Sequence, residues 1–101
     1  MQQEWRTYVY AKLRSADSSA LGRLELAAEL GDKMRSIHSV EKVNYCANCT
    51  EDGTVKVHYT IISMGDIYNR LTRLKMDISA EEFEVFVSDT GTETERLFER
   101  L

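Results

Sequence analysis

Residues 43–62 read VNYCANCTEDGTVKVHYTII, and this stretch decides the fold. Apolar residues alternate with polar ones along both arms, which is the period of a β-strand that buries one face. The intervening Glu51-Asp52-Gly53 has the length of a three-residue hairpin loop, whose last position favours glycine because the backbone there is left-handed. The stretch therefore predicts an antiparallel β-hairpin.

Hydrophobicity also selects the register of this hairpin. With Thr50 opposite Thr54, the apolar side chains of both strands fall on one face, and Tyr45 lies opposite Tyr59. A register shifted by one residue would set Tyr45 against a threonine and mix apolar with polar side chains. We therefore expect the unshifted pairing.

Further elements are predicted on the N-terminal side of the hairpin. Residues 5–13 alternate in the manner of a strand. A helix is expected from Ala20 onward, because the serines and the aspartate within residues 15–19 offer several candidate N-caps. Gly31 either ends this helix early or allows close packing, and the sequence leaves both open. The predicted apolar stripe of the helix consists of Leu21, Leu24, Ala27, Ala28, Leu30, Met34 and Ile37.

After the hairpin, Asp66 is a candidate cap for a second helix with a buried stripe of Ile67, Leu71 and Leu74. A fourth strand is predicted from the alternation of Phe83, Val85 and Val87. Residues 92–101 are expected to form a short helix with Leu97, Phe98 and Leu101 on one side. This order predicts an α+β chain of the ferredoxin-like, split βαβ plan (βαββαβ), with an antiparallel sheet, helices on one face and an added C-terminal helix.

Length and composition favour one soluble domain spanning residues 1–101. The chain has 101 residues and is 43% hydrophobic, which suffices for a single core. No apolar run approaches the roughly 20 residues that cross a bilayer, so no membrane partner is expected. The N-terminus lacks the pattern of a secretory signal, and with two cysteines in the chain the expected location is cytoplasmic, with reduced thiols.

Charge is distributed unevenly along the chain. The net charge of −4 arises in residues 63–101, since acidic and basic residues balance before them. Within residues 77–99, eight acidic side chains accompany Arg96. This acidic segment is either a solvated surface or a surface that binds a basic partner or mimics nucleic acid, and the solvated surface is the simpler interpretation.

Cys46 and Cys49 form a Cys-x-x-Cys pair, which with His38 and His58 would supply four potential zinc ligands. The hairpin register places Cys49 toward the core and Cys46 outward opposite His58, so the four donors would not converge. A redox pair would normally open a helix, whereas this pair lies in a hairpin. We therefore expect neither a metal nor another cofactor.

The outward face of the predicted sheet is the main candidate site. Basic side chains around exposed tyrosines suit single-stranded nucleic acid, because cations follow phosphates and rings stack on bases. Alternatively, this face is covered by the C-terminal helix or by a second subunit, since an open apolar patch is rare on monomers. The candidate interaction residues are Arg6, Tyr8, Tyr10, Lys12, Lys42, Lys56, His58, Leu97, Phe98 and Leu101.

Catalytic motifs are missing from the sequence, which has no nucleophile elbow, no phosphate-binding glycine loop and no helical His/Glu metal pair. Glu81 and Glu82 are adjacent, which places them on different sides of their backbone. No motif is specific enough to name a family. The leading hypothesis is a non-enzymatic interaction or regulatory module that binds a protein partner or forms a homodimer through its sheet face or C-terminal helix. The alternatives are a single-stranded nucleic-acid-binding protein and a small-ligand sensor at a dimer interface.

Overall fold

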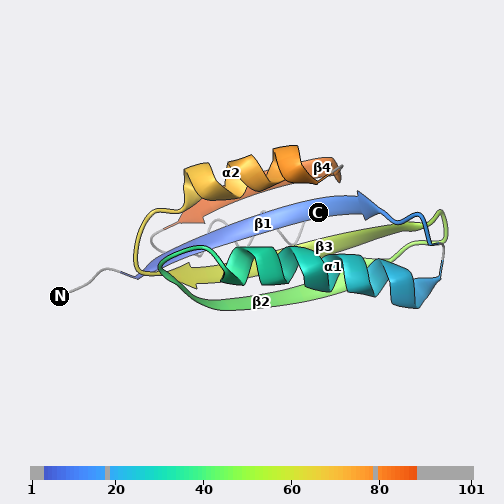
Figure 1. The fold of residues 1–101 in the computed structure, drawn as a ribbon, viewed down its shortest axis with the longest axis horizontal. Helices are drawn as coiled ribbons and strands as arrows, with labels where there is room; N and C mark the ends of the chain where they lie inside the picture. The colour runs from blue at the N-terminus through green and yellow to red at the C-terminus, as the bar shows by residue number, and fades with distance from the viewer. Residues whose placement is uncertain (1–3, 18, 79, 89–101) are drawn as a thin grey trace.

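The computed structural model describes residues 4–17, 19–78 and 80–88. Within them the chain is α+β, with a four-stranded antiparallel sheet and two helices (Figure 1), as the sequence predicts. The sheet has the strand order β2-β3-β1-β4. The expected helix at residues 92–101 lies outside the described residues. The elements are β1 (Trp5–Arg14), α1 (Ala20–Arg35), β2 (Val40–Cys49), β3 (Thr54–Ser63), α2 (Tyr68–Asp77) and β4 (Ala80–Ser88).

The β2–β3 hairpin has the predicted register. Tyr45 pairs with Tyr59 along the ladder. The Thr50 N–H donates to the Thr54 carbonyl at 2.9 Å, which closes the loop. Gly53 has a φ of 88°, the left-handed conformation that the loop requires. Local turn chemistry and strand period therefore suffice to place this hairpin.

Gly31 lies inside α1 and does not end the helix. A Cβ at this position would meet the rings of Tyr59 and Tyr45 at 3.5 and 3.6 Å. The helix begins at its N-cap Ser19, whose hydroxyl accepts from the Gly22 N–H at 3.1 Å, and it runs to Arg35. Of the two alternatives left open for Gly31, the structure shows close packing against the sheet.

The predicted apolar stripe of α1 is wrong at its N-terminal end. Leu21 is 68% exposed and Leu24 is 44% exposed, although both were expected to be buried. At about 100° per residue, Leu21 lies roughly 120° around the helix from the buried Ala27. The buried face of the helix consists of Ala27, Leu30, Gly31 and Met34.

Helix α2 is held to the sheet by few side chains. Asp66 accepts a hydrogen bond from the Tyr68 N–H at 2.9 Å, although the N-cap position itself is taken by Ile67. Ile67 and Leu71 are buried, and Leu74 is partly buried against the core. The predicted stripe of this helix is therefore correct, with Leu71 at its centre.

The core lies between the two helices and the sheet face that carries the odd-numbered residues of β1 and β3. Val9, Ala11, Val57, Tyr59 and Ile61 are fully buried there. We call the opposite side of the sheet the outer face. The helix-facing core cluster follows from strand parity, because alternate side chains of a strand point to opposite faces.

Candidate interaction surfaces

The outer face holds Tyr8 and Tyr10 in a buried state, which corrects the expectation that both rings are exposed. Tyr8 is 3% exposed and Tyr10 is 4% exposed. Both belong to β1, an interior strand of the sheet, so each ring has neighbours on two sides. Tyr8 is flanked by Thr60 and Phe86 in the ladders. In this conformation neither ring is accessible for stacking on a base.

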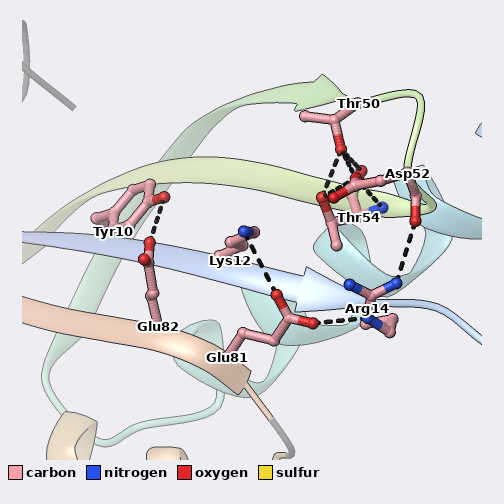
Figure 2. Close-up of polar contacts among 8 residues, drawn as sticks. All are labelled: Tyr10, Lys12, Arg14, Thr50, Asp52, Thr54, Glu81 and Glu82. Atoms are coloured by element: carbon pink, nitrogen blue, oxygen red, sulfur yellow. Dashed lines mark hydrogen bonds and ion pairs between the residues drawn. The ribbon is translucent and has the colours of Figure 1, made fainter.

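The hydroxyl of Tyr10 is held by an acid from the neighbouring strand. It donates to a carboxylate oxygen of Glu82 at 2.8 Å (Figure 2). The ring centroid of Tyr10 lies 5.4 Å from that of His58 on the other side. Burial, followed by the hydrogen bond to Glu82, raises the pKa of Tyr10 to about 12. Tyr10 therefore serves as a protonated, structural hydrogen-bond donor between β1 and β4.

Two of the cations expected to follow phosphates are instead paired with acids. Lys12 Nζ lies 3.5 Å from a carboxylate oxygen of Glu81. Arg6 Nε lies 3.9 Å from a carboxylate oxygen of Glu4. Burial lowers the pKa of His58 below its ordinary value of 6.5, so this imidazole is mainly neutral at pH 7. Of the other two candidate cations, Lys42 is exposed and Lys56 is half-buried.

Sequence reasoning missed the acids that β4 brings to this face. Glu82 and Glu84 pair with Lys12 and Tyr10 of β1. Glu81 occupies an extra position where the β1–β4 register shifts. The carboxylate of Glu81 lies near Lys12, and the carboxylate of Glu82 accepts a hydrogen bond from Tyr10. The expectation that these adjacent glutamates diverge therefore fails at the bulge. The alternation of Glu82, Glu84 and Phe86 could have indicated an acidic outer edge, but only if the partner strand had been known.

A polar cluster ties the hairpin loop to the end of β1 (Figure 2). Both threonine hydroxyls, of Thr50 and Thr54, donate to one carboxylate oxygen of Asp52, Thr54 at 2.7 Å. Arg14 Nη1 donates to the Asp52 carbonyl at 3.1 Å, and Arg14 Nε donates to Glu81 at 2.6 Å. The side chains of the cluster are thus hydrogen-bonded to one another or to the loop backbone, and we assign the cluster to fold closure and not to ligand binding.

Asp52 lies in the hairpin loop and accepts hydrogen bonds through its carboxylate. Its hydrogen bonds from Thr50 and then from Thr54 hold the pKa of this carboxyl well below its ordinary value of 3.8. Because the folded pKa is the lower one, Asp52 stabilises the fold above about pH 4, and this contribution is lost as the pH falls below that value. Asp52→Asn is expected to lower the midpoint of urea unfolding at pH 6. The difference from wild type should shrink toward pH 2.

A suitable control for Asp52→Asn is Glu51→Gln, which removes a charge from the neighbouring exposed position. This variant should leave the midpoint close to wild type across the same pH series. Equal effects of the two substitutions, or a constant difference from pH 6 to pH 2, would show that the hydrogen bonds of Asp52 do not stabilise the loop.

Cys46 and Cys49 point to opposite faces of the sheet, as the register predicts. Cys46 pairs with His58 and is exposed on the outer face. Cys49 lies on the helix side, with its sulfur 3.8 Å from the Ala20 carbonyl. His38 is exposed after the end of α1. Within residues 4–17, 19–78 and 80–88, no three potential metal ligands come together.

One cavity of about 270 Å³ lies between α1, the end of β1 and the end of α2. Apolar side chains form much of its wall, with two basic and two acidic side chains among them. It is slightly smaller than the usual range for small-molecule sites. Its lining residues are Leu13, Arg14, Leu26, Glu29, Leu30, Lys33, Asp77 and Ile78. This cavity lies within a single chain, so it does not test the alternative of a small-ligand sensor at a dimer interface.

An apolar strip that sequence reasoning did not identify runs along the edge strand β2 and the adjoining side of α1. Cys49 contacts α1 at Ala20, and Tyr45 lies beside Gly31 of the same helix. Leu24 and Ala28 stand between these two contacts at helical spacings of three or four residues, so they lie on the side of α1 that faces β2. Leu24 is 44% exposed and Tyr45 is 38% exposed. We call this set the edge strip, and it consists of Leu24, Ala28, Tyr45, Ala47 and Cys49.

Comparison with known proteins gives no relative for this chain: no family model, no curated protein and no solved structure matches it. Among the described helices, neither has the length and apolar character to traverse a lipid bilayer.

Proposed function

We propose that this protein is a non-enzymatic protein-interaction module whose contact surface is the edge strip and the outer edge of β2. The observation that supports this most directly is the exposure of Leu24 and Tyr45 beside a strand that ends the sheet. Apolar side chains beside an unpaired strand edge provide both burial and backbone hydrogen bonds to a partner. We further propose that the fold is of the ferredoxin-like plan, which the strand–helix–strand–strand–helix–strand order supports.

The outer face is a weaker candidate for this contact. Its central rings, Tyr8 and Tyr10, have almost no exposed surface, so a partner would gain little apolar burial from them. The same burial removes the stacking platform that single-stranded nucleic acid requires. The helix-based contact through Leu97, Phe98 and Leu101 lies outside the described residues.

The proposed surface is tested by Leu24→Glu, with Met76→Glu as the matched control. Both positions are exposed and apolar, Met76 at 87%, but Met76 belongs to α2, which packs on β4 at the far edge of the sheet. The readouts are self-association by light scattering and capture of binding proteins from a native lysate. We expect Leu24→Glu to reduce association at least tenfold, because it places a charge in a desolvated contact, and Met76→Glu to leave it unchanged.

Two results would contradict the proposed surface: association that is insensitive to Leu24→Glu, or an equal loss with Met76→Glu. Titration of labelled RNA and single-stranded DNA at low and moderate salt tests the nucleic-acid alternative in parallel. We expect no salt-sensitive binding. Salt-sensitive binding that Lys42→Glu weakens would favour the nucleic-acid alternative instead, because Lys42 is an exposed candidate cation on that face.

A further inference from the structure

The outer edge of β2 presents backbone groups for pairing. The Thr50 N–H donates to Thr54 of β3, and in an antiparallel ladder such hydrogen-bonded pairs recur at every second residue. Even-numbered residues of β2 therefore direct their backbone groups toward β3, and Tyr45, Ala47 and Cys49 direct theirs outward. Arg35 supports this parity, because its Nη2 reaches the carbonyl of the odd-numbered Val43 at 3.2 Å.

Within its own residues this edge lacks most of the features that usually prevent strands from pairing with other chains. Arg35 of α1 covers one outward carbonyl, that of Val43, so its guanidinium has to share that oxygen or move aside when the edge is paired. Sheet edges are commonly protected by charged residues, prolines or bulges. In β2 the charges Glu41 and Lys42 and the register shift are confined to the start of the strand. From Val43 to Cys49 the strand has neither a charge nor a proline. In the described part of the chain, no strand lies beyond β2.

The sequence of the edge is complementary to itself. We propose that two copies of this chain pair antiparallel through β2, with the two-fold axis at Cys46, and so form a continuous sheet. This arrangement sets Asn44 opposite Asn48 of the second copy, where two amides can exchange hydrogen bonds. Tyr45 lies opposite Ala47 of the second copy, which pairs a large side chain with a small one. Val43 lies opposite Cys49 of the second copy, which pairs two apolar side chains.

The parity of the backbone groups agrees with this register. Centring the pairing on Cys46 matches odd-numbered residues with odd-numbered ones, so Tyr45 and Ala47 of each copy meet with their outward N–H and C=O groups. Cys46 then faces Cys46 of the second copy in a non-hydrogen-bonded pair, with Cα atoms about 4.5 Å apart. The edge strips of both copies adjoin along the same line, which buries Leu24 and Tyr45. The inference rests on the proposed function and names its partner as a second copy.

The first test uses single-cysteine variants oxidised with diamide, which takes up the two electrons and two protons that leave the thiols. Cys49→Ser retains only Cys46 and is expected to give a covalent dimer rapidly. Cys46→Ser retains only Cys49, which in this register lies roughly 20 Å from its equivalent, and it should give little dimer. Equal yields from the two variants, or no covalent dimer from Cys49→Ser, would overturn the register.

The second test replaces the two exposed asparagines with charges. Asn44→Asp with Asn48→Asp sets like charges opposite each other twice per dimer, and we expect a roughly tenfold weaker dimer by analytical ultracentrifugation. Asn44→Asp with Asn48→Lys makes the same pairs attractive and should restore the wild-type dimer. Circular dichroism checks that both variants are folded. A dimer that responds equally to both double variants would contradict the pairing.

A wild-type chain that stays monomeric up to millimolar concentration would overturn the second copy as the partner. The two proposals fail separately. A monomer whose capture of another protein is still abolished by Leu24→Glu would leave the proposed surface standing while rejecting self-pairing. A dimer that is unaffected by Leu24→Glu and by both asparagine variants would reject the surface and the pairing together.

Discussion

Replacement of Tyr59 by alanine is expected to lower the free energy of unfolding by about 3–5 kcal/mol, the range for large-to-small changes of buried aromatic residues. Tyr59 is 0% exposed and belongs to β3, an interior strand of the sheet. Its ring centroid lies 5.4 Å from that of Tyr45, and its hydroxyl donates to the Ala27 carbonyl of α1. The substitution would therefore leave a cavity between the sheet and α1 as well as remove a helix–sheet hydrogen bond.

Urea unfolding followed by circular dichroism measures this effect, with Tyr59→Phe as the matched control. The phenylalanine keeps the ring and removes only the hydroxyl, so we expect a loss of about 1 kcal/mol. The two variants separate packing from hydrogen bonding at one position. A loss for Tyr59→Phe as large as that for Tyr59→Ala would show that the hydroxyl and not the ring fixes α1 to the sheet.

The Leu71→Ala variant is expected to lose about 2–5 kcal/mol, with the loss concentrated in α2. Leu71 is 0% exposed and is the buried residue within the bounds of this helix. Ile67 precedes the helix and is 3% exposed, so only a short apolar segment attaches α2 to the sheet. Removal of the Leu71 side chain should allow α2 to open without unfolding of the β1–β3 pairing.

Amide hydrogen exchange distinguishes this local opening from global unfolding. In Leu71→Ala, the amides of α2 should exchange much faster while those of β1 and β3 keep most of their protection. Leu74→Ala, at a partly buried position, should give a smaller effect of the same kind. Uniform loss of protection across the sheet would contradict the idea that α2 is a separately opening element.

These stability predictions bear on the proposed function. The edge strip lies on α1 and β2, and Tyr59 supports both by packing against Tyr45 and by holding Ala27. We therefore expect Tyr59→Ala to weaken association as well as stability, whereas α2 lies over β4 at the opposite edge of the sheet (Figure 1). Loss of α2 contacts in Leu71→Ala should leave association at the β2 edge intact.

The candidate site was less predictable than the fold. Charge and aromatic content pointed to Tyr8, Tyr10 and Lys12, but the structure buries both rings and pairs Lys12 with Glu81. Tyr10 and its partner Glu82 are separated by 72 positions in the chain, and no local pattern relates them. The exposure of Leu24 was missed because helical spacing does not show where the sheet beneath the helix ends.

The sequence alone determined the strand parity, the hairpin register and the opposite directions of Cys46 and Cys49. These features follow from a two-residue period and from a loop glycine, which act over a few neighbouring residues. Only the tertiary structure decided which strands flank β1, that Gly31 receives the rings of Tyr45 and Tyr59, and that β2 is left at an edge. The physical reason is that pairing between distant strands fixes burial and charge neutralisation, and both depend on neighbours that are remote in sequence.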